Sequence, residues 1–218
     1  MISIKQDFIP ASAMKRPQLK QTIRYLTIHS TGNAKSTAQN ERNWLTNPTN
    51  SRQASFHVVV DEKQAIQCIP FHEVAYHAGD GQGDGNRSSI GLEICESGDR
   101  AKALKNAAEL AAKLLNQFNL PISKMVQHNH WSGKDCPRIL RNQSYIKNNM
   151  DWPYFVGLVK KELGELEKLN LDIVLPDGKV FPTTAINDNG SNYVQIRPLL
   201  EALGYKVGWK APRITVNK

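Results

Sequence analysis

The feature that most restricts the fold is a helical pattern that stands between two β-like runs. Apolar residues recur at helical spacing from Ala101 to Phe118, and Pro121 prevents the helix from continuing much further. The run "IGLEICES" (90–97) precedes this helix, and "KMVQHNHW" (124–131) follows it and leads into a polar loop. A strand, a helix and a second strand in succession are typical of an α/β domain.

Three further segments have the character of strands or of a loop between strands. "YLTIHST" (25–31) alternates between two faces, as a strand requires, and ends in a loop. "SFHVVVD" (55–61) and "AIQCIP" (65–70) are short β-rich runs that predict a hairpin. "HAGDGQGDGNRSS" (77–89) contains four glycines and predicts a loop.

Two more helices are predicted. The first begins at Ser36, which forms a capping-box pattern with Gln39, and stops before Pro48. The second is the amphipathic run "YFVGLVKKELGELEKL" (154–169). We therefore expect an α/β domain in residues 1–168, with a central mixed β-sheet flanked by helices.

The C-terminal segment differs in character and predicts a second, small α+β domain in residues 169–218. "LDIVLPDGKVF" (171–181) has two β runs around a hairpin signal at Asp177-Gly178, and "NYVQIRPLLEALGYKVGW" (192–209) indicates a strand, a short helix and a strand. Neither histidine nor cysteine occurs after Cys136. Any imidazole or thiolate chemistry is therefore expected in the first domain.

The net charge of +8 favours an anionic partner such as nucleic acid, a lipid surface or the acidic polymers of a bacterial wall. Nucleic acid is not expected, because the basic residues are scattered and no known nucleic-acid-binding motif is present.

No apolar run is long enough to span a membrane, and charges and prolines interrupt residues 1–20, unlike a signal peptide. We therefore expect synthesis in the cytoplasm. The three cysteines are an odd number at wide spacing, which predicts reduced thiols. The oligomeric state is not predicted.

The segment "VQHNHWSGKDCP" (126–137) concentrates residues that bind metals. A catalytic zinc ion takes three protein ligands, usually from His, Cys and carboxylate, and leaves the fourth position to water. His29 at a strand end, one of His128 and His130, and Cys136 would supply such a set. Taken singly, each of these side chains is more often an ordinary surface or core residue.

Five segments resemble one known family in sequence and in order. The segments are "TIHSTGN", "SFHVVVDE", "HAGDG", "IGLEICES" and "HNHWSGKDCP". They are similar to zinc-dependent N-acetylmuramoyl-L-alanine amidases of the bacteriophage T7 lysozyme and peptidoglycan-recognition-protein group. The narrower resemblance is to endolysins and autolysins of Gram-positive bacteria and their prophages, and it covers roughly residues 20–160. It implies an enzyme that hydrolyses the amide bond between N-acetylmuramic acid and the L-alanine of the peptidoglycan stem peptide, acting on the cell wall after release from the cytoplasm.

The resemblance also implies which residues bind the metal. In this family the second metal histidine lies eight residues before the cysteine, which selects His128 and not His130. His29, His128 and Cys136 are therefore expected to bind one Zn²⁺, with water as the fourth ligand. One thiolate against a dication leaves a positive centre that can acidify the bound water.

Two charged residues match catalytic positions of the family. Glu93 would take a proton from the attacking water and deliver one to the leaving amine, and Lys134 would stabilise the oxyanion that forms on the carbonyl oxygen. The T7 branch has a tyrosine where this chain has Phe56, and a phenyl ring cannot donate a hydrogen bond, which favours the endolysin branch. His57 and His77 are expected to contact substrate.

Two alternatives to the enzyme are a non-catalytic peptidoglycan-binding module of the same fold and a structural zinc site. The binding modules typically lack the cysteine ligand, so Cys136 favours an enzyme. A structural site needs four protein ligands, and Cys68 or Cys95 would have to complete it. His72 and His130 are expected to have no catalytic role.

The C-terminal segment resembles the copper amine oxidase N-terminal-like repeat domain of wall-associated proteins. The resemblance covers "YVQIRPLLEALGYKVGW" (193–209) and the preceding "PDGK" (176–179). The segment contains no His, Cys or Met, so copper binding is not expected. We expect residues 169–218 to be a cell-wall-binding module, with a purely structural appendage as the alternative.

Overall fold

The structure is a computed structural model, and its contacts divide the chain into two compact units, residues 1–163 and 164–218. Each unit is described by itself. Among the helices of the described residues, none combines the length and the apolar character needed to cross a membrane. The described residues are 2–164, 167–174, 180–188, 191–194, 200–201, 203–204, 206–210 and 213–217.

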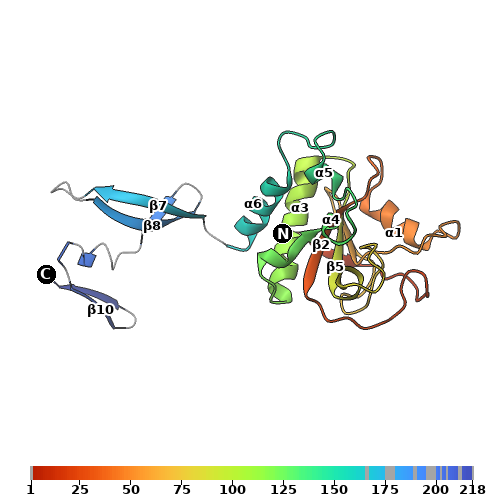
Figure 1. Cartoon of the computed structure of the whole chain (residues 1–218), viewed down its shortest axis with the longest axis horizontal. Coiled ribbons are helices and arrows are strands. Elements are labelled where there is room, and N and C mark those ends of the chain that lie inside the picture. Colours follow the sequence, from red (N-terminus) through yellow and green to blue (C-terminus); the bar gives the residue numbers. More distant parts are fainter. Residues whose placement is uncertain are drawn as a thin grey trace. The chain divides into compact units, whose positions relative to one another are not determined.

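The first unit is built around one six-stranded sheet in the order β1-β4-β3-β5-β2-β6 (Figure 1). β3 and β4 form the predicted antiparallel hairpin, whereas the other neighbouring strands are parallel. This confirms the α/β fold with a central mixed sheet. The strands are β1 (Ile4–Gln6), β2 (Tyr25–Ser30), β3 (Val58–Val60), β4 (Ala65–Gln67), β5 (Ser89–Ile94) and β6 (Met125–Gln127).

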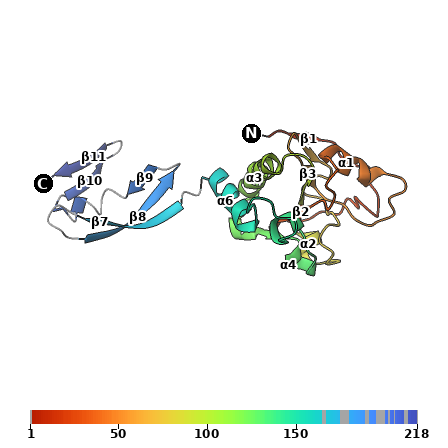
Figure 2. The same ribbon diagram turned by 90° about the horizontal axis from the view of Figure 1, so that it is seen from above.

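Helices cover both faces of this sheet. α3 and α6 lie on one face and α1 lies on the other (Figures 1 and 2). Ile28 and Leu92 pack into the core beneath α3, whereas Val59 packs with Ala38 and Leu45 of α1. The helices are α1 (Ala38–Thr46), α2 (Asp84–Arg87), α3 (Arg100–Gln117), α4 (Asn129–Ser132), α5 (Arg138–Arg141) and α6 (Trp152–Glu162), with a 3₁₀ turn at Ile122–Lys124.

The two core layers determine where the polar strand residues point. Neighbouring residues of a strand face opposite sides of the sheet. Because Ile28 and Leu92 face α3, the adjacent His29 and Glu93 face the side of α1. The alternation in the sequence therefore places these two polar groups on the same face of the sheet.

The helix α1 begins one residue later than predicted. Thr37 is the N-cap, and its hydroxyl accepts a hydrogen bond from the backbone N–H of Asn40. The predicted cap, Ser36, is buried and its side chain hydrogen-bonds Glu41 instead. The capping-box pattern with Gln39 therefore located the helix but not its first residue.

Three other boundaries differ from the prediction. The glycine-rich loop contains the short helix α2, and β6 leads into the short helix α4 rather than into an irregular loop. α6 ends at Glu162, whereas the prediction extended it to residue 169. Gly164 has a φ of +69°, a left-handed conformation that terminates a helix, and the residues from Glu167 form a strand.

The strands described in the second unit form two antiparallel sheets. β7 (Glu167–Val174), β8 (Val180–Asp188) and β9 (Ser191–Val194) form an antiparallel sheet, and β10 (Lys206–Lys210) pairs with β11 (Arg213–Asn217). The predicted turn at Asp177-Gly178 and most of the predicted short helix lie outside the described residues, although Val174 pairs with Val180 across that turn. The predicted boundary at residue 168 falls within β7. The contacts instead divide the chain just before Gly164.

Candidate metal centre and catalytic cleft

The candidate site lies where three parallel strands end. His29 of β2 is directly opposite Glu93 of β5 in the sheet register. His128 follows β6, and its backbone N–H donates to the carbonyl of Ile28 at 3.1 Å. Because the carboxyl ends of neighbouring parallel strands meet at one edge of the sheet, these three side chains converge there.

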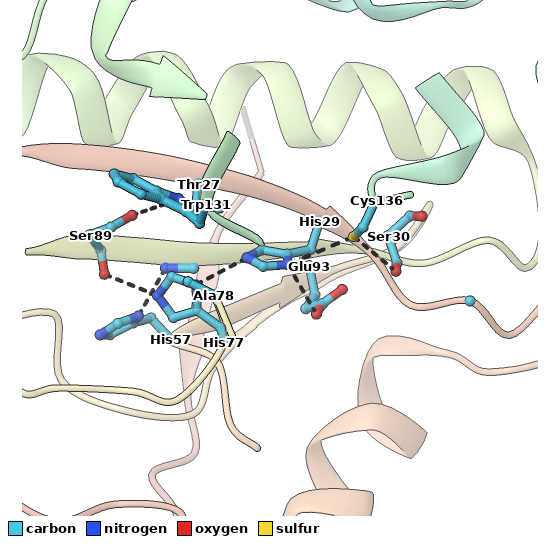
Figure 3. A network of polar contacts seen from close by, with 12 residues as sticks. Thr27, His29, Ser30, His57, His77, Ala78, Ser89, Glu93, Trp131 and Cys136 are labelled. Atoms are coloured by element: carbon cyan, nitrogen blue, oxygen red, sulfur yellow. Dashed lines mark hydrogen bonds and ion pairs between the residues drawn. The ribbon is translucent and has the colours of Figure 1, made fainter. Parts of the chain in front are cut away.

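His29, His128 and Cys136 form a cluster that fits a metal ion. One possible ligand atom from each residue lies within 4.8 Å of the other two, and all three side chains are buried. His29 Nδ1 is 3.8 Å from Cys136 Sγ (Figure 3). Ligand atoms of a tetrahedral zinc site are about 3.3 to 3.6 Å apart, so the cluster needs only a small contraction to hold zinc.

The structure brings His128 to the cluster and leaves His130 outside it. His130 lies on α4, is exposed and packs against the Trp131 ring with a centroid distance of 4.6 Å. Cys68 and Cys95 are buried and unpaired but do not belong to the cluster. Within the described residues, no fourth protein ligand of a closed structural zinc site accompanies the three.

Polar atoms without partners surround this cluster. Both ring nitrogens of His128 and the Oε2 atom of Glu93 are buried and have no hydrogen-bond partner among the described residues. Most buried polar atoms in folded proteins have a partner, so unpaired ones at a shared point indicate a ligand. A cation in the cluster would satisfy a lone pair of His128.

The pKa values of the three candidate ligands reflect their burial. Burial, followed by the nearby charge of Lys134, lowers the pKa of His128 to about 4, and burial is also the main cause that holds the pKa of His29 well below its ordinary value. Both imidazoles are therefore neutral, as metal binding requires. Burial raises the pKa of the Cys136 thiol to about 12, and a bound dication would reverse this by favouring the thiolate.

Glu93 lies beside the cluster at the base of a cleft. Its side chain is 16% exposed, and Oε1 is 3.9 Å from His29 Nδ1. Burial and then the negative charge of Glu41 raise the pKa of Glu93 to about 8, whereas Lys134 acts in the opposite direction. A dication in the cluster would favour the ionised form, which can accept a proton.

The cleft has a volume of about 950 Å³ and includes the three candidate ligands, Glu93 and Lys134 in its wall. Lys134 is exposed, follows α4 and lines the cleft, and its positive charge lowers the pKa of both His29 and His128. The cleft thus combines a cluster that fits a metal, a largely buried carboxyl group and a cation.

Several residues of the cleft wall were given no role in the sequence analysis. Two of them, Glu41 and Trp44, come from α1 and reach the cleft only because α1 packs on the sheet. Phe56 also lines the cleft, with an apolar ring as expected. The residues that sequence analysis did not single out include Thr31, Glu41, Trp44, Arg52 and Tyr76.

The structure separates the two histidines that were predicted to contact substrate. His77 lines the cleft and is 9% exposed, and its Nδ1 is 3.0 Å from His29 Nε2. His57 is fully buried and does not line the cleft. His57 Nδ1 accepts from the Gly91 N–H at 2.9 Å, and His57 Nε2 is 2.8 Å from the Glu73 carbonyl oxygen. Substrate contact by His57 gains no support from this geometry, because its ring is buried and hydrogen-bonded within the unit.

The chain is similar to known proteins in sequence. The family described as N-acetylmuramoyl-L-alanine amidase matches residues 19–139. The N-acetylmuramoyl-L-alanine amidase CwlH of Bacillus subtilis (strain 168) is 36% identical over 210 residues, which cover 94% of this chain and 80% of CwlH. The amidase XlyA of the same organism is 44% identical over 144 residues, which cover 64% of this chain and 48% of XlyA.

A solved structure supports the same assignment. The structure of the catalytic domain of XlyA superposes with a TM-score of 0.66 and 40% sequence identity, covering 72% of this chain and 99% of that domain. The matched family segment contains all three candidate metal ligands, Glu93 and Lys134. The chain therefore belongs to the N-acetylmuramoyl-L-alanine amidase family, as its motifs predict.

Proposed function

We propose that residues 1–163 hydrolyse the amide bond between N-acetylmuramic acid and the L-alanine of the peptidoglycan stem peptide with the help of one Zn²⁺. The observation that carries this proposal is the convergence of His29, His128 and Cys136 beside a buried carboxyl group in an open cleft. Three protein ligands leave one coordination position for water or substrate, as catalytic zinc sites do. Family membership supports the reaction type, and the names of CwlH and XlyA support the bond.

The residues of the cleft divide the chemistry between them. Zinc held by the three side chains would supply a Lewis acid for the amide carbonyl and for the attacking water. Glu93 accepts the proton of that water and then donates a proton to the nitrogen of the leaving L-alanine. Lys134 places its ammonium group beside the carbonyl oxygen and stabilises the negative charge that develops there.

A non-catalytic peptidoglycan-binding module is the second candidate for a protein of this fold. A binding module needs the cleft but needs neither a complete metal site nor a carboxyl group next to it. Here the thiol of Cys136 completes the cluster, and Glu93 Oε2 is buried without a partner among the described residues. These two features favour the enzyme.

For the second unit we propose cell-wall binding. The solved catalytic domain of XlyA matches 72% of this chain, a share close to that of residues 1–163, which supports a role outside the chemistry for the second unit. A separate unit that binds the wall would raise the local concentration of the cleft on an insoluble substrate. Binding of a 164–218 fragment to purified walls, compared with binding of the full chain, tests this proposal.

The proposed reaction is tested with purified bacterial walls and the full-length chain. We expect one zinc ion per chain by elemental analysis, and released fragments whose masses show cleavage between N-acetylmuramic acid and L-alanine. Cys136→Ser should lose most of the zinc and the activity, because a neutral hydroxyl replaces a thiolate. Glu93→Gln should keep the zinc and reduce the rate by roughly 10²- to 10⁴-fold, because an amide cannot accept the proton of water.

The exposed residue His72 provides a matched control, since His72→Ala removes a histidine outside the cleft. This variant should keep both zinc and activity. Wild-type hydrolysis by Glu93→Gln would refute the assignment of the base. Fragments cut at another bond would refute the proposed substrate bond while leaving the metal site intact.

A further inference from the structure

His77 joins a candidate metal ligand to the backbone of the sheet. Its Nδ1 atom is 3.0 Å from Nε2 of His29, and its Nε2 atom is 3.2 Å from the carbonyl oxygen of Ser89 in β5 (Figure 3). The other nitrogen of His29, Nδ1, is the one that lies 3.8 Å from Cys136 Sγ. His77 thus contacts the ligand on the side away from the metal position.

The carbonyl group of Ser89 determines which atom donates in each of these two hydrogen bonds. A carbonyl oxygen can only accept, so His77 Nε2 carries a proton and donates it. A neutral imidazole has a single N–H group, and that of His77 is used at Nε2. His77 Nδ1 is therefore an acceptor, and the proton between the two rings belongs to His29 Nε2.

The position of the candidate metal leads to the same assignment of a proton to His29 Nε2. A neutral histidine that binds a metal through Nδ1 must carry its proton on Nε2. The two derivations start from independent contacts and agree. The acceptor on His77 thus favours the one neutral form of His29 that directs a lone pair toward Cys136.

Two features of the fold hold His77 in this place. A Cβ atom on Gly91 would lie 2.7 Å from His77 Cγ, so the ring can rest against β5 only because residue 91 is glycine. The side-chain oxygen of Asn86 accepts hydrogen bonds from the backbone N–H groups of His77 and Ala78, at 2.8 and 2.9 Å. The glycine-rich loop that includes α2 therefore fixes the backbone on which His77 stands.

We propose that His77 is a positioning residue, which fixes the tautomer and the orientation of the metal ligand His29 rather than contacting the reacting bond. The inference rests on the proposed zinc site and goes beyond it, because it assigns a function to a residue outside the ligand set. It also replaces the prediction that His77 is a substrate contact. Partners of this kind commonly change metal affinity by 10- to 100-fold when they are lost.

The test compares two replacements of His77 in the full-length chain. His77→Asn keeps an acceptor oxygen close to the position of Nδ1, whereas His77→Leu removes it. Zinc affinity is measured by competition with a chelator, and the tautomer of His29 is read from ¹⁵N chemical shifts of the metal-free protein near neutral pH. His72→Leu, at an exposed histidine outside the cleft, is the control for loss of an imidazole.

We expect His77→Leu to bind zinc roughly 10- to 100-fold more weakly, His77→Asn to stay within a few-fold of the wild type, and His72→Leu to be unchanged. The wild type should show His29 protonated on Nε2, and His77→Leu should show a mixture of tautomers. Equal zinc affinities for the leucine variant and the wild type would overturn the proposal. So would a wild-type His29 protonated on Nδ1, a result that does not depend on how the variants fold.

The two readouts also separate this inference from the proposed function. A wild-type protein that binds no zinc would contradict the proposed metal centre. The tautomer of His29 would still test the hydrogen bonds that connect His29, His77 and Ser89. Zinc bound normally with the opposite tautomer would contradict only the role of His77.

Discussion

The substitution Gly91→Ala should disturb the metal site by displacing the ring of His77, without changing any metal ligand. The added Cβ would lie 2.7 Å from His77 Cγ, 2.9 Å from Cδ2 and 3.0 Å from Nδ1. β5 has little freedom to move away, because the Gly91 N–H donates to His57 Nδ1 and the Gly91 carbonyl accepts from the His57 N–H. The ring of His77 must therefore give way.

The size of the effect follows from these contacts. Ordinary van der Waals contact begins at 3.4 Å, so the ring has to move by about 0.7 Å, which is enough to break a 3.0 Å hydrogen bond to His29. Overpacking costs about 1 to 3 kcal/mol, and the broken buried hydrogen bond costs about the same. Alanine recovers about 0.5 to 1 kcal/mol of backbone entropy. We expect a net loss of about 3 kcal/mol in the free energy of unfolding.

Urea denaturation followed by tryptophan fluorescence measures this loss, since Trp44, Trp131 and Trp152 all lie in the first unit. Gly157→Ala is the matched control, because a Cβ there meets no atom within 4 Å and α6 should gain about 0.5 to 1 kcal/mol. Zinc affinity should fall in Gly91→Ala and stay constant in the control. A Gly91→Ala protein as stable as the wild type, with unchanged zinc affinity, would refute the steric argument.

Three further predictions concern other parts of the first unit. Lys134→Ala should bind zinc normally and lower the rate of amide hydrolysis by roughly 10²- to 10³-fold, and an effect on KM alone would make Lys134 a binding residue. His128→Ala should lose zinc in elemental analysis and His130→Ala should retain it; the reverse result would show that the wrong histidine was assigned. Arg16→Met should lower the free energy of unfolding by about 1 to 3 kcal/mol at neutral pH. Arg16 donates hydrogen bonds to both carboxylate oxygens of Glu73, at 2.8 and 2.9 Å. These bonds hold the pKa of the Glu73 carboxyl below its ordinary value. The stabilisation by this ion pair is present above the ordinary pKa of a glutamate and is lost as pH falls through the lowered pKa of Glu73. The difference in the free energy of unfolding between variant and wild type, measured by urea denaturation, should therefore shrink in acid. A difference that stays constant with pH would contradict the assignment.

The sequence predicted the sheet and the polar strand ends because local patterns determine both. Alternation in "YLTIHST" and "IGLEICES" identified β2 and β5 and placed His29 and Glu93 on the face opposite to the core beneath α3. The resemblance of "HNHWSGKDCP" to the amidase family selected His128, and the structure places that histidine, and not His130, in the cluster. The first prediction depends on periodicity within one segment, and the second on the family pattern.

Features that depend on contacts between distant segments were not predicted. Glu41 becomes a neighbour of Glu93 only because α1 packs on the sheet, and nothing in the helix sequence marks this. The exclusion of His57 from the cleft likewise depends on its buried hydrogen bonds to Gly91 and Glu73. The end of α6 at Glu162 was missed because the apolar pattern continues into β7, beyond Gly164.

Cys136 and His29 lie close together in the fold although they are far apart along the chain. The two side chains meet at 3.8 Å although 107 positions separate them in the sequence. A metal ion bound to both would act as a reversible cross-link across much of the first unit, and by mass action it would add about 2.7 kcal/mol of stability when the free ion is at 100 times its dissociation constant. Resistance of the enzyme to proteases would then rise and fall with the supply of zinc around it.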